Sequence, residues 1–105
     1  MKKYELSIGL NDAESKVQEI ATEDAVKIIS LVCFKKAGGV TIIPNCTGIY
    51  RHEDGTKIIE NTIRCEFYDA PREIVIEIAK ILCKELNQES IAFSESIIDG
   101  DFISA

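Results

Sequence analysis

The side chains best suited to acid–base chemistry lie near the middle of the chain. The segment 50–55, Tyr-Arg-His-Glu-Asp-Gly, contains His52, the only histidine of the sequence. An imidazole titrates near neutral pH, which suits a general acid or base. Glu53 or Asp54 could orient His52, which could act with Glu53 or Glu60 in a small hydrolase or lyase. Neighbours in a turn rarely point together, however, so the alternative for His52 is a solvated turn residue.

Two arginines, Arg51 and Arg64, are the cations best placed to hold a small anion. Arginine offers a planar bidentate fork to phosphate or carboxylate groups. The net charge of −6 repels nucleic-acid backbones and anionic membranes, so we expect no DNA, RNA or membrane partner. A small polar or nucleotide-like ligand is still compatible, because converging arginines outweigh a screened, distributed charge at short range. Arg64 could instead form a cross-strand ion pair.

The four cysteines give no sign of a metal site. They are scattered through apolar runs without a C-x-x-C pair, at Cys33, Cys46, Cys65 and Cys83. Structural zinc sites use close ligand pairs, and a single histidine with dispersed carboxylates does not define a metal site either. We therefore expect reduced core thiols, no metal, no cofactor and a cytoplasmic location.

The hydrophobic pattern predicts six elements around these residues. Alternation predicts strands, a 3.6-residue period predicts helices, and Asp54-Gly55 is a hairpin signal. Thr22 should cap the first helix and Gly38-Gly39 should end it. Pro44 should lie on an edge strand or at a bulge, because proline cannot donate a ladder hydrogen bond. The predicted elements are strand 3–10, helix 22–37, strand 40–52, strand 57–68, helix 71–87 and strand 89–98.

This order, βαββαβ, predicts an α+β fold of ferredoxin-like type over a single domain, 1–105, with a short frayed tail after residue 98. Both helices should cover one face of an antiparallel four-stranded sheet and leave the other face open. Alternation along the third strand should place Glu60, Thr62, Arg64, Glu66 and Tyr68 on that open face. Asn61 interrupts the apolar row on the helix side.

A set of short motifs resembles a group of small, uncharacterised bacterial and phage proteins of ferredoxin-like fold. The motifs are Gly39-x-Thr41, Gly48-x-Tyr50, Asp54-Gly55, Glu60 and the run 88–91, Gln-Glu-Ser-Ile. The resemblance spans about residues 3–98, and it adds Glu60, Gln88 and Glu89 to the candidate site. The alternative for Gln88 and Glu89 is that they satisfy backbone groups where the second helix ends.

The resemblance extends to phage-encoded anti-defence proteins of similar size that form oligomers and sequester nucleotide-derived signals. It therefore implies a non-enzymatic homo-oligomer that binds a small polar or nucleotide-like ligand, in the cytoplasm of a bacterial host if the chain is phage-encoded. No catalytic residue is assigned in this interpretation. The alternatives are the hydrolase or lyase described above and a protein-binding module. The expected ligand-binding residues are Tyr50, Arg51, His52, Glu60, Arg64, Gln88 and Glu89.

Overall fold

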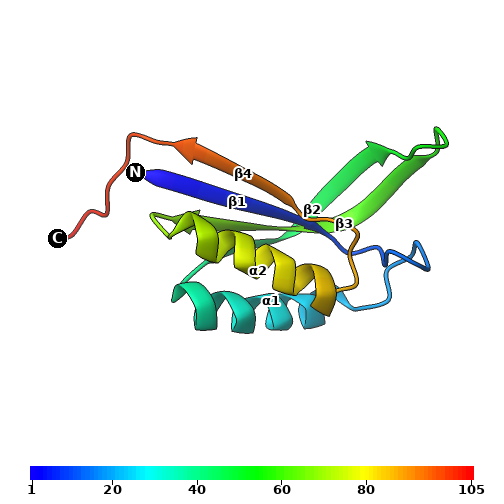
Figure 1. The fold of residues 1–105 in the computed structure, drawn as a ribbon, viewed down its shortest axis with the longest axis horizontal. Coiled ribbons are helices and arrows are strands. Elements are labelled where there is room, and N and C mark those ends of the chain that lie inside the picture. Colours follow the sequence, from blue (N-terminus) through cyan, green and yellow to red (C-terminus); the bar gives the residue numbers. More distant parts are fainter.

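The computed structural model describes residues 1–105. Its elements follow the order β1 (Lys2–Gly9), α1 (Thr22–Ala37), β2 (Thr41–Arg51), β3 (Lys57–Tyr68), α2 (Arg72–Glu85) and β4 (Ala92–Ile97). The antiparallel sheet has the strand order β2-β3-β1-β4, and both helices lie on one of its faces (Figure 1). This arrangement confirms the predicted ferredoxin-like fold.

Two local predictions differ from the structure. The residue before α1 is Ala21, whose side chain cannot cap the helix, so Thr22 is the first helical residue and not the cap. β4 begins at Ala92 and not at residue 89, because the chain leaves α2 through Asn87 in a left-handed conformation (φ 47°) and Gln88 still donates to the Cys83 carbonyl at 2.8 Å. Residues 88–91 therefore form a loop.

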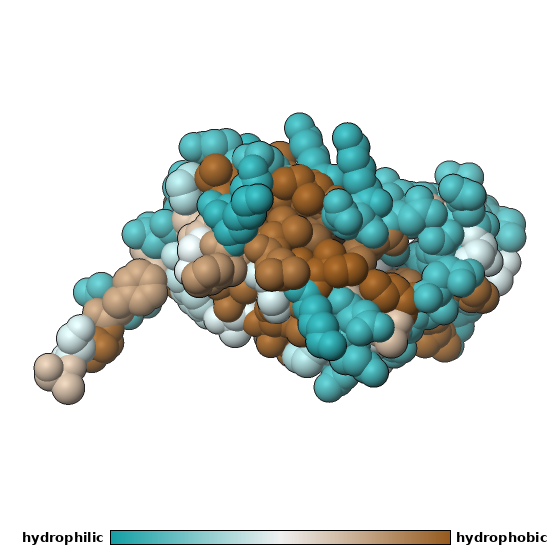
Figure 2. All heavy atoms as spheres, turned by 90° about the horizontal axis from the view of Figure 1, so that it is seen from below, coloured by the Kyte–Doolittle hydropathy of each residue, from teal (hydrophilic) through white to brown (hydrophobic).

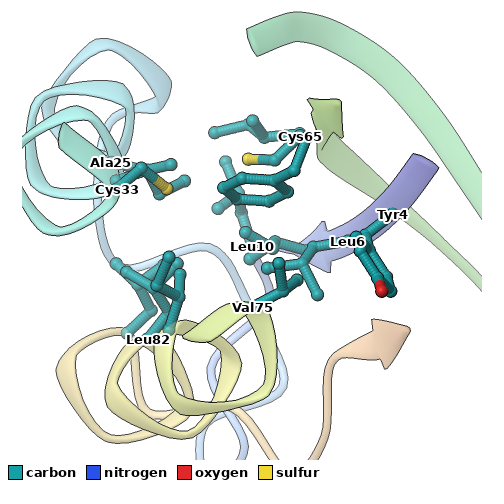
Figure 3. Packing of buried hydrophobic residues seen from close by; sticks show 14 residues of the cluster. Tyr4, Leu6, Leu10, Ala25, Cys33, Cys65, Val75 and Leu82 are labelled. Carbon is teal, nitrogen blue, oxygen red and sulfur yellow. The ribbon is translucent and has the colours of Figure 1, made fainter. Parts of the chain in front are cut away.

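The core lies between the sheet and the helices and is entirely apolar. β1 contributes Tyr4, Leu6 and Ile8, and β3 contributes alternate residues that face them, while each helix buries one stripe. In Figure 3 the thiols of Cys33 and Cys65 point toward each other across this core. The neighbouring Cys33 thiol and burial raise the pKa of the Cys65 thiol. Cys46 and Cys83 are only half-buried, so the expectation of four core thiols holds for two of them.

The β2–β3 hairpin extends beyond the helices (Figure 1). Its cross-strand partners Ile49 and Ile59 are 63% and 58% exposed, since no helix covers this part of the sheet. Pro44 lies on the edge strand β2, within a register irregularity between Ile43 and Cys46, as predicted. Asn61 sits near the end of the helix-covered region and donates to the Gln18 side chain at 2.7 Å, which explains its place in an otherwise apolar row.

The outer surface of the helices also carries apolar side chains. Figure 2 shows this face, with hydrophobic residues gathered between hydrophilic ones. Leu31 and Phe34 of α1 are each 73% exposed. The residues after β4 form no helix or strand and extend away from the body (Figure 1). No helix has the length and hydrophobicity that crossing a membrane requires.

Candidate functional site

A cleft of about 410 Å³ opens on the sheet face that the helices leave bare. Alternation along the strands places small and polar side chains on its floor, and two loops form its walls. We call it the open-face cleft. Its floor residues are Ser7 and Gly9 of β1, Gly48 and Tyr50 of β2, Ile58, Glu60 and Thr62 of β3, and Ala92 of β4, and Ile49 of β2 borders it. Its walls and rim are Asn11, Asp12, Ala13, Lys16, His52, Gln88, Glu89 and Ser90.

The two wall loops, 11–18 and 87–90, are held together by hydrogen bonds. Gln88 Nε2 donates to the Asn11 carbonyl at 2.8 Å, and the Ala13 amide donates to the Asn87 carbonyl at 2.9 Å. Asn87 Nδ2 donates to Asp12 Oδ1 at 2.9 Å. This bond, with backbone amides at the loop turn, lowers the pKa of the Asp12 carboxyl. In Figure 1 the loop after β1 and the loop before β4 meet at the same end of the sheet.

The Glu60 carboxylate lies on the cleft floor in a fixed position. Its Oε2 atom accepts a hydrogen bond from the Asn11 amide at 2.9 Å. A Cβ atom at Gly9 would overlap the same carboxylate, so the absence of a side chain at position 9 makes room for it. Gly48 of β2 acts similarly for Thr62, whose Oγ1 would lie 2.6 Å from an added Cβ. Two glycines on the strands that flank β3 therefore shape this floor.

Charged and aromatic groups surround Glu60. Lys16 Nζ lies 3.0 Å from Glu89 Oε1, and this contact lowers the pKa of Glu89. Burial raises the pKa of Tyr50, and the negative charges of Glu60 and Glu89 act in the same direction. The Tyr50 phenol therefore stays protonated at neutral pH and can donate a hydrogen bond to a ligand.

His52 lines the rim of the cleft, but the carboxylate that pairs with its ring belongs to neither Glu53 nor Glu60. Its Nδ1 atom lies 3.5 Å from Asp54 Oδ1. Its backbone amide donates to the Thr56 carbonyl at 2.8 Å, within the hairpin turn. His52 is thus a half-buried turn residue at the mouth of the cleft.

The structure brings five of the seven candidate residues to the cleft and leaves two outside. Tyr50, His52, Glu60, Gln88 and Glu89 line it, and the two arginines do not. Arg64 lies on the open face, with its Nη2 atom 3.0 Å from Glu5 Oε1 and 3.8 Å from Glu66 Oε2. Arg64 therefore forms the cross-strand ion pair that was the alternative to a ligand-binding role. Arg51 is exposed at the end of β2.

The cleft residues absent from the sequence-based set include Asn11, Asp12 and Lys16. These three belong to the connection between β1 and α1, and only the folded chain brings this connection against the loop before β4. The signal in the sequence was the length of the connection, since a segment longer than a tight turn requires often has a role of its own. No cluster of three histidine, cysteine or acidic side chains is close enough to hold a metal ion.

Comparisons with known proteins relate this fold to two groups. No family model and no curated protein matches the chain. A phage SAM lyase in complex with S-methyl-5′-thioadenosine superimposes with a TM-score of 0.70 at 19% identity, over 90% of this chain and 79% of that chain. The apo state of phage SAM lyase gives a TM-score of 0.62 at 21% identity, over 90% and 78%. CutA from Xylella fastidiosa gives 0.62 at 16% identity, over 95% and 86%. At these identities the likeness shows a shared fold.

Proposed function

We propose that the open-face cleft binds an adenosine thioether or sulfonium, and that the chain cleaves S-adenosylmethionine (SAM) to release S-methyl-5′-thioadenosine. The observation that carries this proposal is the Glu60 carboxylate, fixed by the Asn11 amide on the floor of the cleft. The likeness to a phage SAM lyase with this nucleoside bound supports it at the level of the fold. The resemblance to small phage proteins supports a nucleotide-derived ligand, but it implies binding without cleavage.

The charges of the cleft favour a cationic ligand over a phosphate. Asp12, Glu60 and Glu89 supply three carboxylates, and Lys16 supplies the only ammonium group. A nucleotide phosphate would meet repulsion there, because both arginines lie elsewhere. The sulfonium of SAM carries a positive charge next to the ribose, and it would be attracted to Glu60. The Tyr50 ring offers a surface for cation–π contact or for stacking of the adenine base.

The proposed reaction breaks the bond between the sulfonium sulfur and the γ-carbon of the amino-acid arm. The electron pair of that bond returns to sulfur, so the neutral thioether S-methyl-5′-thioadenosine leaves. In a lyase reaction no water is consumed. The α-carboxylate of the same substrate closes onto the γ-carbon, and the four-carbon fragment departs as a cyclic ester. Glu60 holds the sulfonium in the cleft, and the walls keep the arm folded for this closure.

The test is incubation of the purified chain with SAM followed by mass spectrometry of the small molecules. We expect S-methyl-5′-thioadenosine together with the cyclic ester of homoserine. Glu60→Gln should lower kcat/KM by about ten- to a hundredfold, because the sulfonium loses a charged contact worth about 1.5–3 kcal/mol that draws it into the cleft. Glu53→Gln is the matched control, because it removes the same charge from the hairpin turn outside the cleft. Equal rates for both variants would refute a role for Glu60.

Sequestration without cleavage is the second candidate function, and the same polar cleft favours it. Heat-denaturing the protein after incubation distinguishes the two. Release of intact SAM indicates a binding protein, as the sequence resemblance implies, whereas release of the thioadenosine indicates a lyase. Homoserine in place of its cyclic ester at the earliest time points would indicate a hydrolase. If SAM is neither retained nor cleaved, the protein-binding module becomes the better interpretation.

A further inference from the structure

Lys16 is the only lysine or arginine that lines the open-face cleft. Every other fully charged group around it is a carboxylate, from Asp12, Glu60 or Glu89. A cleft with this composition attracts the sulfonium of the proposed ligand and repels the carboxylate of its amino-acid arm. We infer that Lys16 binds this carboxylate and so selects ligands that carry an amino-acid arm over simple thioadenosines. The inference rests on the proposed function and names the ligand group that a further residue recognises.

The loop around Lys16 is built to hold the lysine at the cleft. The Asp12 amide donates to the Val17 carbonyl at 2.8 Å, and the Lys16 amide donates to the Asp12 carbonyl at 2.9 Å. Asp12 Oδ2 also accepts from the Glu14 and Ser15 amides at 3.0 and 3.1 Å. Lys16 itself has a left-handed backbone (φ 66°), which is uncommon for a residue with a Cβ atom. The surrounding bonds maintain this conformation.

The partner of Lys16 in this structure is replaceable. Its Nζ atom lies 3.0 Å from Glu89 Oε1 on the adjoining wall loop, and the two side chains are 54% and 71% exposed. An ion pair this exposed is weak, because water screens both charges. A ligand carboxylate that enters the cleft can therefore take the place of Glu89 without a large penalty. The Lys16 ammonium then binds the ligand carboxylate instead of the Glu89 carboxylate.

Three uncharged-sulfur ligands separate this role from binding of the nucleoside. S-Adenosylhomocysteine keeps the full amino-acid arm, its decarboxylated analogue keeps only the amine, and S-methyl-5′-thioadenosine has neither. None of them is a sulfonium, so none has the leaving group of the proposed reaction. Titration calorimetry of the intact chain with each ligand gives three dissociation constants for each variant.

We expect the unmodified chain to bind S-adenosylhomocysteine about tenfold more tightly than its decarboxylated analogue, the scale of one exposed charge-assisted hydrogen bond. Lys16→Gln should abolish this preference and leave affinity for S-methyl-5′-thioadenosine within about twofold, while Lys16→Arg should retain most of it. Lys27→Gln is the matched control, because Lys27 is an exposed lysine of α1 outside the cleft. It should change none of the three constants.

Two results would overturn the inference. One leaves the proposed function intact, and the other refutes it as well. If S-methyl-5′-thioadenosine binds but the preference is absent, or persists in Lys16→Gln, the role of Lys16 is wrong and the proposed function stands. If none of the three ligands binds the unmodified chain, the proposed function fails and the role of Lys16 fails with it.

Discussion

Replacing Gly9 with alanine should disable the site while leaving the fold intact. Gly9 is in β1 and has no left-handed backbone angle, so an alanine fits the strand conformation. The added Cβ would overlap the Glu60 carboxylate. That carboxylate is the end of a flexible side chain, and it can rotate away. The strain is therefore relieved by moving the functional group and not by moving the backbone.

The substitution should cost little stability but much of the cleavage rate. Moving Glu60 breaks its bond to the Asn11 amide, worth about 1 kcal/mol for a charged hydrogen bond at a partly exposed site. Such a loss lowers the melting temperature of a chain of this size by roughly 4–8 °C. A displacement of about 1 Å at a reacting centre, in contrast, costs on the order of a hundredfold in rate. We expect Gly9→Ala to melt cooperatively and to lose almost all cleavage of SAM.

Gly39→Ala is the matched control for this experiment. An added Cβ at Gly39 would meet nothing within 4 Å, and this glycine also lacks a left-handed backbone angle. It should keep both the rate and the melting temperature. A Gly9→Ala variant that melts normally and still cleaves SAM at the original rate would refute the reasoning about the Glu60 position.

Three further outcomes are expected. Because the folded-state pKa of Asp12 is lowered, its stabilising contribution is complete above the unfolded pKa of about 4 and is lost as pH falls through the lower folded value. In chemical denaturation the stability difference between the original chain and Asp12→Asn should therefore shrink as pH drops from 5 to 3, and a difference that grows would contradict this. Arg64→Ala should cost at most about 1 kcal/mol, because its ion pair with Glu5 is partly exposed, and calorimetry should show unchanged binding of S-methyl-5′-thioadenosine. Weakened binding of S-methyl-5′-thioadenosine would indicate that Arg64 belongs to the binding site. The chain should also self-associate, because Ile49 and Ile59 leave apolar surface on the hairpin, and light scattering that gives the monomer mass of 11.7 kDa at all micromolar concentrations would remove this prediction.

The fold could be predicted from the sequence because local signals agree with one another. The helix 22–37 and the strand Lys57–Tyr68 have the predicted bounds, and Gly38 ends α1 in the left-handed conformation that glycine favours. The start of β4 was misplaced, because the backbone turn at Asn87 is set by contacts with the loop after β1.

The candidate site could be predicted only in part, because some of its residues are brought together by contacts between distant parts of the sequence. Glu60 was found because alternation along the third strand assigns its side chain to the open face. Tyr50 was found because it lies beside the hairpin turn and within the motif Gly48-x-Tyr50. Lys16 was missed because its place in the cleft depends on a contact with Glu89, 73 residues away. Arg64 was assigned to the correct face, but its cross-strand partners engage it, and sequence alternation does not reveal which charges on a face are already paired.

The most direct measurement of the central claim is a two-dimensional ¹H–¹⁵N NMR titration of the chain with S-methyl-5′-thioadenosine. If the nucleoside occupies the open-face cleft, the amide signals of Gly9, Asn11, Gly48 and Gln88 should shift together and saturate. The Asn11 amide is especially informative, because it donates to Glu60. Saturating shifts confined to Arg51 and the hairpin turn, or no shifts at millimolar nucleoside, would contradict the account.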